Sequence, residues 1–353
     1  MDPESLSIAM LATGDPHHAH RGFAESVGAD VITLQPGPDA VAGTVLEDAY
    51  NGLRAPVPDH DVILLEGSGE VYATPRIARH TDATVVYVCD DHRPYGTASY
   101  DFSAGTLPTR LAKRVDRRLD AAALRALLAR HVDGVIAGSG FMADVARAAA
   151  PDTPVRVAPP YIQSDVFERL GSVTPALDTN TAVTVGIGRD HKGVDRLVDV
   201  WPAIRDRVPD AELSVVGPGH PEAYADTPGV EVLGYVDPER LHEILAPASL
   251  YVHPARAEAF GVTVVEALRA GLPAVVTRTT GARSAARAVS PSLVVDSTPD
   301  AIADRVVAYF EADLDARRRL SKRARAEGAT HDAEHGRRRF REQFAAVLAA
   351  LPG

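Results

Sequence analysis

The sequence has a single cysteine, few aromatic residues and no long apolar run. Cys89 alone cannot form an intrachain disulfide, and it excludes a metal site built from several cysteines. The absence of any run of about 18 apolar residues disfavours a membrane-spanning helix. The first residues also lack the basic and apolar regions of a secretory signal. We therefore expect a cytoplasmic protein that does not cross a membrane.

Positive charge is scarce as well, because 37 lysines and arginines face 48 aspartates and glutamates, which gives a net charge of −11. Nonspecific binding to nucleic acid depends on neutralising phosphates with Lys and Arg. The charge therefore argues against a nucleic-acid partner, and any basic site must be local. The sequence is instead rich in Ala, Val and Leu, and its 353 residues exceed what one hydrophobic core usually serves. Two globular domains are expected.

Short apolar runs alternate with helical patterns along the chain. This alternation is typical of parallel sheets covered by helices on both faces. A polar, turn-rich stretch over 168–181 interrupts the pattern and is interpreted as a linker. We predict an α/β protein with two doubly wound, Rossmann-like domains that face a cleft. The first is expected over residues 1–172 and the second over 180–335, with a C-terminal helix over 336–353 that returns to the first domain.

The loop GRDHKG, residues 188–193, follows a predicted strand and precedes a predicted helix. Ligands bind outside the carboxyl ends of the strands in open α/β sheets. Gly188 and Gly193 let the backbone approach an anion, and Arg189 and Lys192 add positive charge. A phosphate or diphosphate fits this loop, and solvated charges on a Gly-rich turn are the alternative. The pattern is neither a Walker loop nor G-x-G-x-x-G, which disfavours a dinucleotide dehydrogenase.

A second stretch, EAFGVTVVEALRAG, places Glu258 and Glu266 on either side of a Phe-Gly break. In a continuous helix their positions would lie about 12 Å apart, which exceeds the roughly 5 to 9.5 Å of a glycoside hydrolase pair. Hydrolysis is therefore disfavoured. Thr263 and Glu266 also match the T-x-x-E capping box, in which the Glu satisfies a backbone N–H. That alternative leaves Glu258, just before a predicted helix start near Gly261, without an explanation.

Together these stretches resemble the donor-binding half of glycosyltransferase family 4, whose members have the GT-B fold. The resemblance rests on GRDHKG, VVGPGH, LGYVD, PERLHEIL and ASLYVHPARAEAFGVTVVEALRAGLPAVV, and it covers about residues 182–295. HVDGVIAGSGFMADVARAAA and VRVAPPYIQSDVF are similar to the last elements of the family's N-terminal domain. The resemblance implies a retaining glycosyltransferase that takes a nucleotide-diphosphate sugar as donor and needs no metal or other cofactor.

The same resemblance implies roles for individual residues. Arg189 and Lys192 would hold the diphosphate, Glu258 would contact hydroxyls of the transferred sugar, and Glu266 would bind the ribose. Backbone groups around the helix start would cradle sugar and phosphate, and the turn after a later strand would border the base. The further donor-binding residues are Gly188, Ala259, Phe260, Gly261, Val262, Thr263, Gly234, Tyr235 and Val236.

The N-terminal half departs from the family's pattern. Where the family commonly ends a strand with V-x-x-H-D, this sequence has TVVYVCDDH, which makes Asp90 and His92 the candidates near the reacting sugar. The first loop, TGDPHHAHRG, lacks the family's double glycine, so Gly14 and Gly22 are the candidates for acceptor-side or phosphate-side contacts. The three histidines of this loop are expected to be exposed to solvent, and no metal site is predicted.

Residues 110–130 concentrate positive charge in an acidic protein, with apolar residues among the basic ones. A basic amphipathic helix can lie on an anionic membrane surface, so peripheral contact with the inner face of the membrane is one interpretation of this segment. An ordinary exposed helix with its apolar face in the core is the alternative. The expected acceptor is a hydroxyl of a glycan, a lipid-linked molecule or a small molecule. A noncatalytic sugar-nucleotide-binding subunit and a nucleotide-sugar epimerase are alternative functions. The basic residues of the segment are Arg110, Lys113, Arg114, Arg117, Arg118 and Arg125.

Overall fold

The protein folds into two compact units. The N-terminal unit contains the described residues up to Tyr161 together with those from Ala333 onward, and the C-terminal unit spans Ile162–Asp332. No helix in the described part of the chain combines the length and the hydropathy that a membrane span requires. The computed structural model describes residues 5–35, 45–91, 93 and 107–351.

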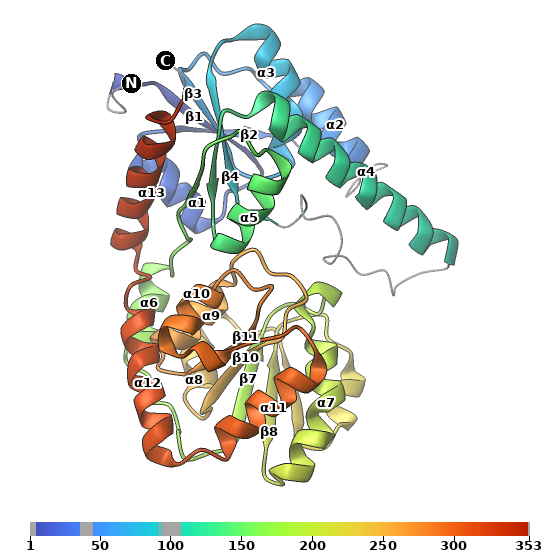
Figure 1. Ribbon diagram of the computed structural model, residues 1–353, viewed down its shortest axis with the longest axis vertical. Helices are drawn as coiled ribbons and strands as arrows, with labels where there is room; N and C mark the ends of the chain where they lie inside the picture. Colours follow the sequence, from blue (N-terminus) through green and yellow to red (C-terminus); the bar gives the residue numbers. More distant parts are fainter. Residues whose placement is uncertain (1–4, 36–44, 92, 94–106, 352–353) are drawn as a thin grey trace. The chain divides into compact units, whose positions relative to one another are not determined.

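The N-terminal unit is built on a six-stranded sheet in the order β2-β1-β3-β4-β5-β6, in which every neighbouring pair is parallel (Figure 1). Its strands are β1 (Ile8–Thr13), β2 (Asp30–Leu34), β3 (Val62–Leu65), β4 (Thr84–Cys89), β5 (Gly134–Ala137) and β6 (Val155–Val157). Its helices are α1 (His18–Ser26), α2 (Val45–Arg54), α3 (Thr74–His80), α4 (Leu107–His131), α5 (Gly140–Ala149) and α13 (Ala333–Leu348). Strands β3 and β5 are buried along their whole length, as expected for parallel strands between two layers of helices.

The C-terminal helix α13 belongs to the N-terminal unit, where it packs against α1, β5 and β6 (Figure 1). Phe340 stacks on Phe23 with ring centroids 4.4 Å apart. A Cβ atom at Gly22 would lie 1.8 Å from the Tyr161 hydroxyl, and one at Gly336 would lie 2.5 Å from Tyr161 Cδ1. The absence of a side chain at both positions therefore lets α1 and α13 approach Tyr161.

The C-terminal unit has a second six-stranded sheet, in the order β12-β11-β10-β7-β8-β9, with parallel neighbours throughout. The predicted α/β fold with two Rossmann-like domains is confirmed. The strands are β7 (Thr181–Val185), β8 (Glu212–Val216), β9 (Val230–Gly234), β10 (Leu250–His253), β11 (Ala274–Thr277) and β12 (Val294–Val295). The helices are α6 (Ser164–Gly171), α7 (Val194–Arg207), α8 (Leu241–Leu245), α9 (Val262–Arg269), α10 (Arg283–Val289), α11 (Pro299–Phe310) and α12 (Leu314–Gly328).

The boundary between the units differs from the predicted end of the first domain at residue 172. Helix α6 already lies in the C-terminal unit, where it contacts α8 and α9. Its apolar residues Val166 and Leu170 are buried there. Two turns of helix carry too few apolar positions for a period to be recognised in the sequence, so the tertiary contacts of α6 decide its place.

Candidate active site

The order of the C-terminal sheet reverses between β7 and β10. The chain runs outward from β7 through β8 to β9, and then from β10 through β11 to β12 on the other side. The loops that follow β7 and β10 therefore diverge at their carboxyl ends, and at such a switch point open α/β sheets usually bind ligands in a crevice between the loops. The loop GRDHKG follows β7 and the loop with Glu258 follows β10, so the two predicted donor loops meet at this point.

The loop after β7 is fixed by close packing against the loop after β8. The Gly188 amide donates to the carbonyl of Pro218 at 2.8 Å. A Cβ atom at Gly188 would lie 2.1 Å from the Gly219 carbonyl oxygen, so the site needs glycine there for packing. Gly193, with φ of +67°, ends the turn and begins α7. Lys192 thereby comes to the crevice, half-buried, at the end of a short 3-10 turn.

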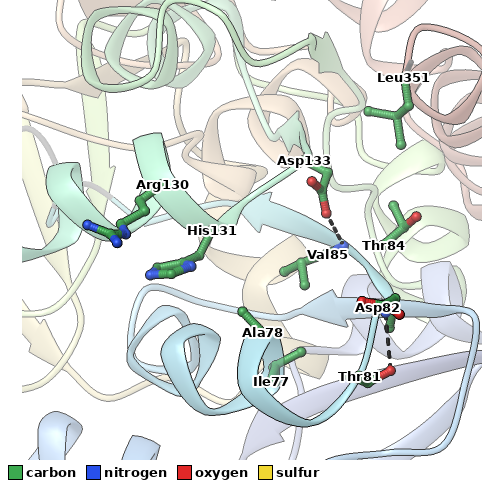
Figure 2. A pocket seen from close by; sticks show the side chains of 11 residues that line it. Ile77, Ala78, Thr81, Asp82, Thr84, Val85, Arg130, His131, Asp133 and Leu351 are labelled. Atoms are coloured by element: carbon green, nitrogen blue, oxygen red, sulfur yellow. Dashed lines mark hydrogen bonds between the residues drawn. The ribbon is translucent and has the colours of Figure 1, made fainter. Parts of the chain in front are cut away.

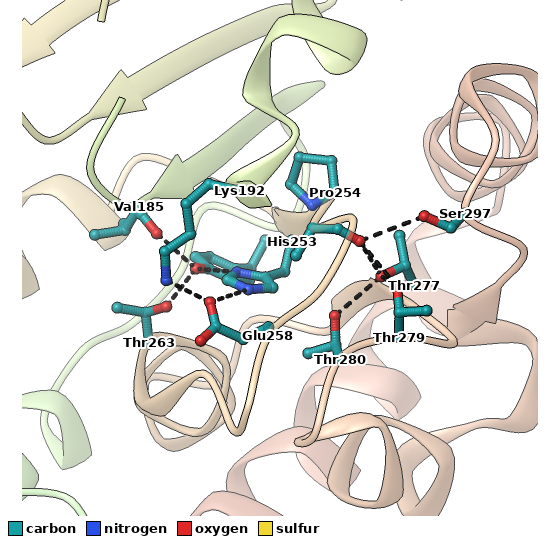
Figure 3. Close-up of polar contacts among 12 residues, drawn as sticks. Val185, Lys192, His253, Pro254, Glu258, Thr263, Thr277, Thr279, Thr280 and Ser297 are labelled. Atoms are coloured by element: carbon teal, nitrogen blue, oxygen red, sulfur yellow. Dashed lines mark hydrogen bonds and ion pairs between the residues drawn. The ribbon is translucent and has the colours of Figure 1, made fainter. Parts of the chain in front are cut away.

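Backbone hydrogen bonds hold the loop after β10 to the loop after β11. The Glu258 amide donates to the Thr279 carbonyl at 3.0 Å, and the Gly281 amide donates to the Glu258 carbonyl at 2.9 Å. The Thr277 hydroxyl donates to the Ala255 carbonyl at 2.6 Å (Figure 3). The backbone that carries the Glu258 side chain is therefore held by hydrogen bonds on both sides.

Glu258 and Lys192 form an ion pair across the crevice, through Oε2 of the carboxylate (Figure 3). His253 Nε2 contacts the same oxygen at 3.2 Å. The side chains of Lys192 and Glu258 are 20% and 11% exposed, which leaves both within reach of a ligand. Burial opposes ionisation of the carboxyl, but the Lys192 ammonium and the His253 ring outweigh it and hold the pKa of Glu258 well below its usual range. Glu258 is therefore a carboxylate at neutral pH, and it acts only as a hydrogen-bond acceptor.

Helix α9 begins at this site, with Gly261 as its N-cap at φ of +90°. The predicted capping box is wrong: Thr263 lies inside the first turn, and its hydroxyl oxygen accepts a hydrogen bond from Tyr251 at 2.8 Å. With Gly261 as N-cap, Val264 rather than Glu266 occupies the third helical position, from which a capping-box carboxylate would accept from the N-cap amide, so Glu266 caps nothing there. Burial raises the pKa of Glu266 to about 7.

The other predicted donor-binding residues occupy different surroundings. The Arg189 side chain is exposed, and it makes no hydrogen bond or ion pair within the described part of the chain. Ala259 and Phe260 are buried in the loop before α9, and Val262 is half-buried at its start. Beyond β9, Tyr235 is 71% exposed and Val236 is half-buried. The structure thus brings Lys192 and Glu258 into contact and leaves Arg189 and Tyr235 open to solvent.

In the N-terminal unit, His20 lies between two carboxylates at the carboxyl ends of the strands. Its Nδ1 contacts Glu66 Oε1 at 2.7 Å, directly after β3, and its Nε2 contacts Asp90 Oδ2 at 3.0 Å, directly after β4. Burial lowers the pKa of the ring, but the hydrogen bonds and charges of Asp90 and Glu66 outweigh it and raise the pKa of His20 to about 10. Asp90 is therefore held by an imidazolium at neutral pH.

Several predictions for this first loop need correction. Of the three histidines expected to be exposed, His17 is exposed and caps α1, whereas His18 is half-buried and contacts the Tyr161 carbonyl at 3.0 Å, and His20 is buried. Gly22 lies inside α1, where close packing against Tyr161 requires glycine, and its predicted ligand contact stays a prediction. Gly14 is exposed at the end of β1 with φ of +76°, and its predicted ligand contact stays a prediction. The other candidate, His92, lies outside the described residues.

A pocket of about 340 Å³ lies at the opposite edge of the N-terminal sheet, where β4 begins (Figure 2). Arg130 and His131, at the end of α4, line it together with Asp133. The Asp133 carboxylate accepts a hydrogen bond from the Val85 amide at 2.8 Å, so this acid has a structural partner. The pocket lies at the amino ends of the strands and does not belong to the site described above.

Sequence reasoning missed His253 and Tyr251, which lie beneath Glu258. Both come from β10, and their rings are near-parallel with centroids 6.2 Å apart. The available signal was the strand SLYVHP, because residues two apart on a strand point to the same face. A histidine at the last position of that strand reaches the edge where the ligand loops begin.

Solved structures of known proteins superpose on almost the whole of this chain. Sucrose-phosphate synthase from Thermosynechococcus elongatus superposes with a TM-score of 0.71, at 17% identity, over 98% of this chain and 99% of its own. HepE from Anabaena, solved in complex with UDP and glucose, superposes with a TM-score of 0.65, at 16% identity, over 98% of this chain and 100% of its own. The chain therefore has the GT-B fold.

Residues 169–327 match the family described as glycosyl transferases group 1. The match lies within the C-terminal unit and includes both predicted donor loops. Among curated relatives, the phosphatidylinositol N-acetylglucosaminyltransferase gpi3 subunit from Schizosaccharomyces pombe is 31% identical over 99 residues, or 26% of this chain and 22% of that protein. The matched stretch spans well under half of the length of the curated relatives.

Proposed function

We propose that the protein is a retaining glycosyltransferase that moves a sugar from a nucleotide-diphosphate sugar to a hydroxyl acceptor. The observation that carries the proposal is the pairing of Lys192 with Glu258 at the switch point of the C-terminal sheet. A transferase of this kind needs a cation where the diphosphate leaves and a carboxylate where sugar hydroxyls bind. Retention of configuration is supported by the family resemblance.

The diphosphate leaving group would be stabilised by charge that the fold places in advance. Lys192 lies at the crevice, Arg189 is exposed on the same loop, and α9 directs the positive end of its dipole to its start at Val262. Fixed charges of this kind stabilise the negative charge that develops in the transition state. We propose that these groups replace a metal ion, so that donor turnover persists in the presence of EDTA.

Glu258 and Glu266 would bind the two sugars of the donor. Glu258 is ionised and anchored through Oε2, which leaves Oε1 to accept a hydrogen bond from a hydroxyl of the transferred sugar. Glu266, one turn into α9, would bind the ribose hydroxyls. The complex of HepE with UDP and glucose supports UDP as the first nucleotide to test.

The raised pKa of Glu266 predicts a pH-dependent affinity for the nucleotide. Its pKa is about 7, so the ribose would meet a protonated acid at pH 6 and a carboxylate at pH 8. If the carboxylate is the form that binds, we expect the affinity for UDP to rise with pH across this window, by up to about tenfold per unit. Calorimetry with UDP measures it, and Glu266→Gln should flatten the dependence. A wild-type affinity that is constant from pH 6 to 8 would contradict the assigned role.

Gly261→Ala should weaken donor binding through a defined steric effect. A Cβ atom there would lie 3.1 Å from Glu258 Cγ and 3.5 Å from His253 Nε2. The positive φ adds strain of roughly 1–2 kcal/mol. Gly28→Ala is the matched control, since Gly28 also has positive φ and no atom within 4 Å of the added Cβ. We expect both variants to unfold at lower temperature and only Gly261→Ala to lose affinity for UDP-sugars; equal affinities would argue against contact at this turn.

We propose that the N-terminal unit recognises the acceptor, with Asp90 at the carboxyl edge of its sheet. A lipid-linked acceptor is supported by the phosphatidylinositol named for the Schizosaccharomyces pombe relative. It is also supported by an apolar surface on α2 and α4, which lie side by side (Figure 1). The members of this α2/α4 surface are Leu46, Tyr50, Leu53, Val115 and Leu119, all exposed.

Charge on the α2/α4 surface favours an anionic membrane. Arg118 is exposed on α4, whereas the two acidic residues of that helix are engaged elsewhere. Asp120 accepts hydrogen bonds from Arg93 at 2.8 and 3.0 Å, and Asp116 accepts one from the Val45 amide at 3.4 Å. We expect sedimentation with vesicles that contain phosphatidylglycerol but not with pure phosphatidylcholine, and a loss of binding in Leu119→Asp. Equal sedimentation with both vesicle types would count against the surface.

The direct test of the function is release of nucleotide diphosphate from a panel of UDP-, GDP- and ADP-sugars, with and without membrane extract. Release that depends on acceptor and on one donor supports the transferase. NMR of the product's anomeric proton then tests retention. Tight donor binding without any release would favour a noncatalytic binding subunit, and an isomeric sugar nucleotide formed without acceptor would favour an epimerase.

A further inference from the structure

A chain of polar contacts lies beneath Glu258 and connects three elements of the C-terminal unit. His253 Nε2 contacts Glu258 Oε2 at 3.2 Å, and His253 Nδ1 contacts the Tyr251 hydroxyl at 3.3 Å (Figure 3). That hydroxyl lies 2.8 Å from Thr263 Oγ1, in the first turn of α9, and 3.3 Å from the Val185 carbonyl, at the end of β7. His253 is 2% exposed and Tyr251 is fully buried. Burying an imidazole costs free energy that burying an apolar side chain of similar size does not, even when both ring nitrogens have partners. Packing alone therefore does not explain a histidine at this position.

We propose that His253 is a positioning residue that fixes the orientation of the Glu258 carboxylate. Its Nε2–H donates to Oε2, so that Oε1 is the oxygen turned toward the donor sugar. The expected effect on turnover rests on the proposed function, whereas the hydrogen bond between His253 and Glu258 does not depend on it.

Chemistry determines the direction of this hydrogen bond. An ionised carboxylate has no proton to donate, so the proton between His253 and Glu258 must lie on Nε2. Lys192 shares the same carboxylate oxygen. With two donors on Oε2, rotation of the carboxylate would break both contacts at once. A lysine alone, on a flexible stem, would not fix the plane of the carboxylate in this way.

The second ring nitrogen of His253, Nδ1, also has a polar partner. Tyr251 holds Nδ1, and Tyr251 in turn contacts Thr263 and the Val185 carbonyl. Because the ring contacts groups from both β7 and α9 through this hydroxyl, a shift of either element relative to β10 would be passed to Glu258. Gly261 completes the arrangement, since its missing Cβ leaves the space 3.5 Å from Nε2 open.

The first experiment reads the tautomer without any need for activity. Protein labelled with ¹⁵N-histidine is compared with His253→Gln, which identifies the His253 signals by their loss. We expect a proton on Nε2 that is protected from exchange with solvent. A neutral ring with its proton only on Nδ1 would overturn the proposal. If Nε2–H is found but no donor is turned over, the positioning contact stands and the proposed function fails.

The second experiment separates positioning from packing. His253→Gln keeps a donor near the position of Nε2, whereas His253→Leu fills the space without one. We expect His253→Leu to lower kcat by about 10- to 100-fold, as for a lost hydrogen bond to a charged group, with UDP affinity within a factor of about three. His253→Gln should recover most of that loss. Equal impairment of both variants, or a His253→Leu enzyme with unchanged kcat, would overturn the proposal.

Discussion

Glu258→Gln is expected to lower kcat/KM for sugar transfer by about a hundredfold or more. The substitution preserves size and removes the charge. Lys192 and His253 both donate to the Oε2 position, so the amide of the variant will place its carbonyl oxygen there. Its NH₂ group then replaces Oε1 and donates where the wild type accepts. A sugar hydroxyl that donated a hydrogen bond to the carboxylate of the wild type would therefore lose its acceptor.

Release of UDP from the active donor measures this effect, with the folding of the variant checked by thermal unfolding. Glu231→Gln is the matched control, because Glu231 is an exposed residue on β9 of the same sheet. The control should turn over donor at the wild-type rate. Activity of Glu258→Gln within about threefold of the control would remove Glu258 from the proposed site.

Lys192→Met should have an effect at least as large, about a thousandfold in kcat/KM, because it removes a fixed charge from the leaving group. It also removes the cation that most strongly stabilises the Glu258 carboxylate. The Lys192 ammonium helps to hold the pKa of Glu258 in the wild type well below its usual range, so the carboxylate is present at neutral pH. Without the ammonium that pKa must rise, and the residual activity should fall off at a higher pH on the acid side.

The measurement for Lys192→Met is kcat/KM as a function of pH, with UDP binding followed separately by calorimetry. Lys322→Met, an exposed lysine on α12, changes the net charge equally and serves as the control. A variant that binds UDP as tightly as the control would show that Lys192 does not contact the diphosphate. Unchanged turnover would contradict the charge-stabilisation role directly.

The two predicted donor loops stand out in the sequence because each is a local pattern. GRDHKG combines glycines with cations after an apolar strand, and the Glu258 stretch combines an acid with a glycine break before a helix. The rule that ligands bind at carboxyl ends of parallel strands places both loops on one edge. Contact between Lys192 and Glu258, 66 positions apart, depends on β7 and β10 being neighbours in the sheet.

The N-terminal unit was harder to interpret for a physical reason. The role of Gly22 depends on Tyr161 and on a helix from the far end of the chain. The burial of His20 depends on Glu66 and Asp90, which follow two different strands. No spacing within the sequence brings these partners together.

The sequence by itself determined the α/β class, the two Rossmann-like domains and the two loops that carry the predicted donor-site residues. The alternation of apolar runs with helical patterns and the glycines at turns extend over only a few residues each, so they can be recognised in the sequence. Only the tertiary structure decided which strands are neighbours, where α6 belongs, that Thr263 and Glu266 form no capping box, and that His253 contacts Glu258. These features depend on contacts between distant segments, where burial and hydrogen bonding override local preference.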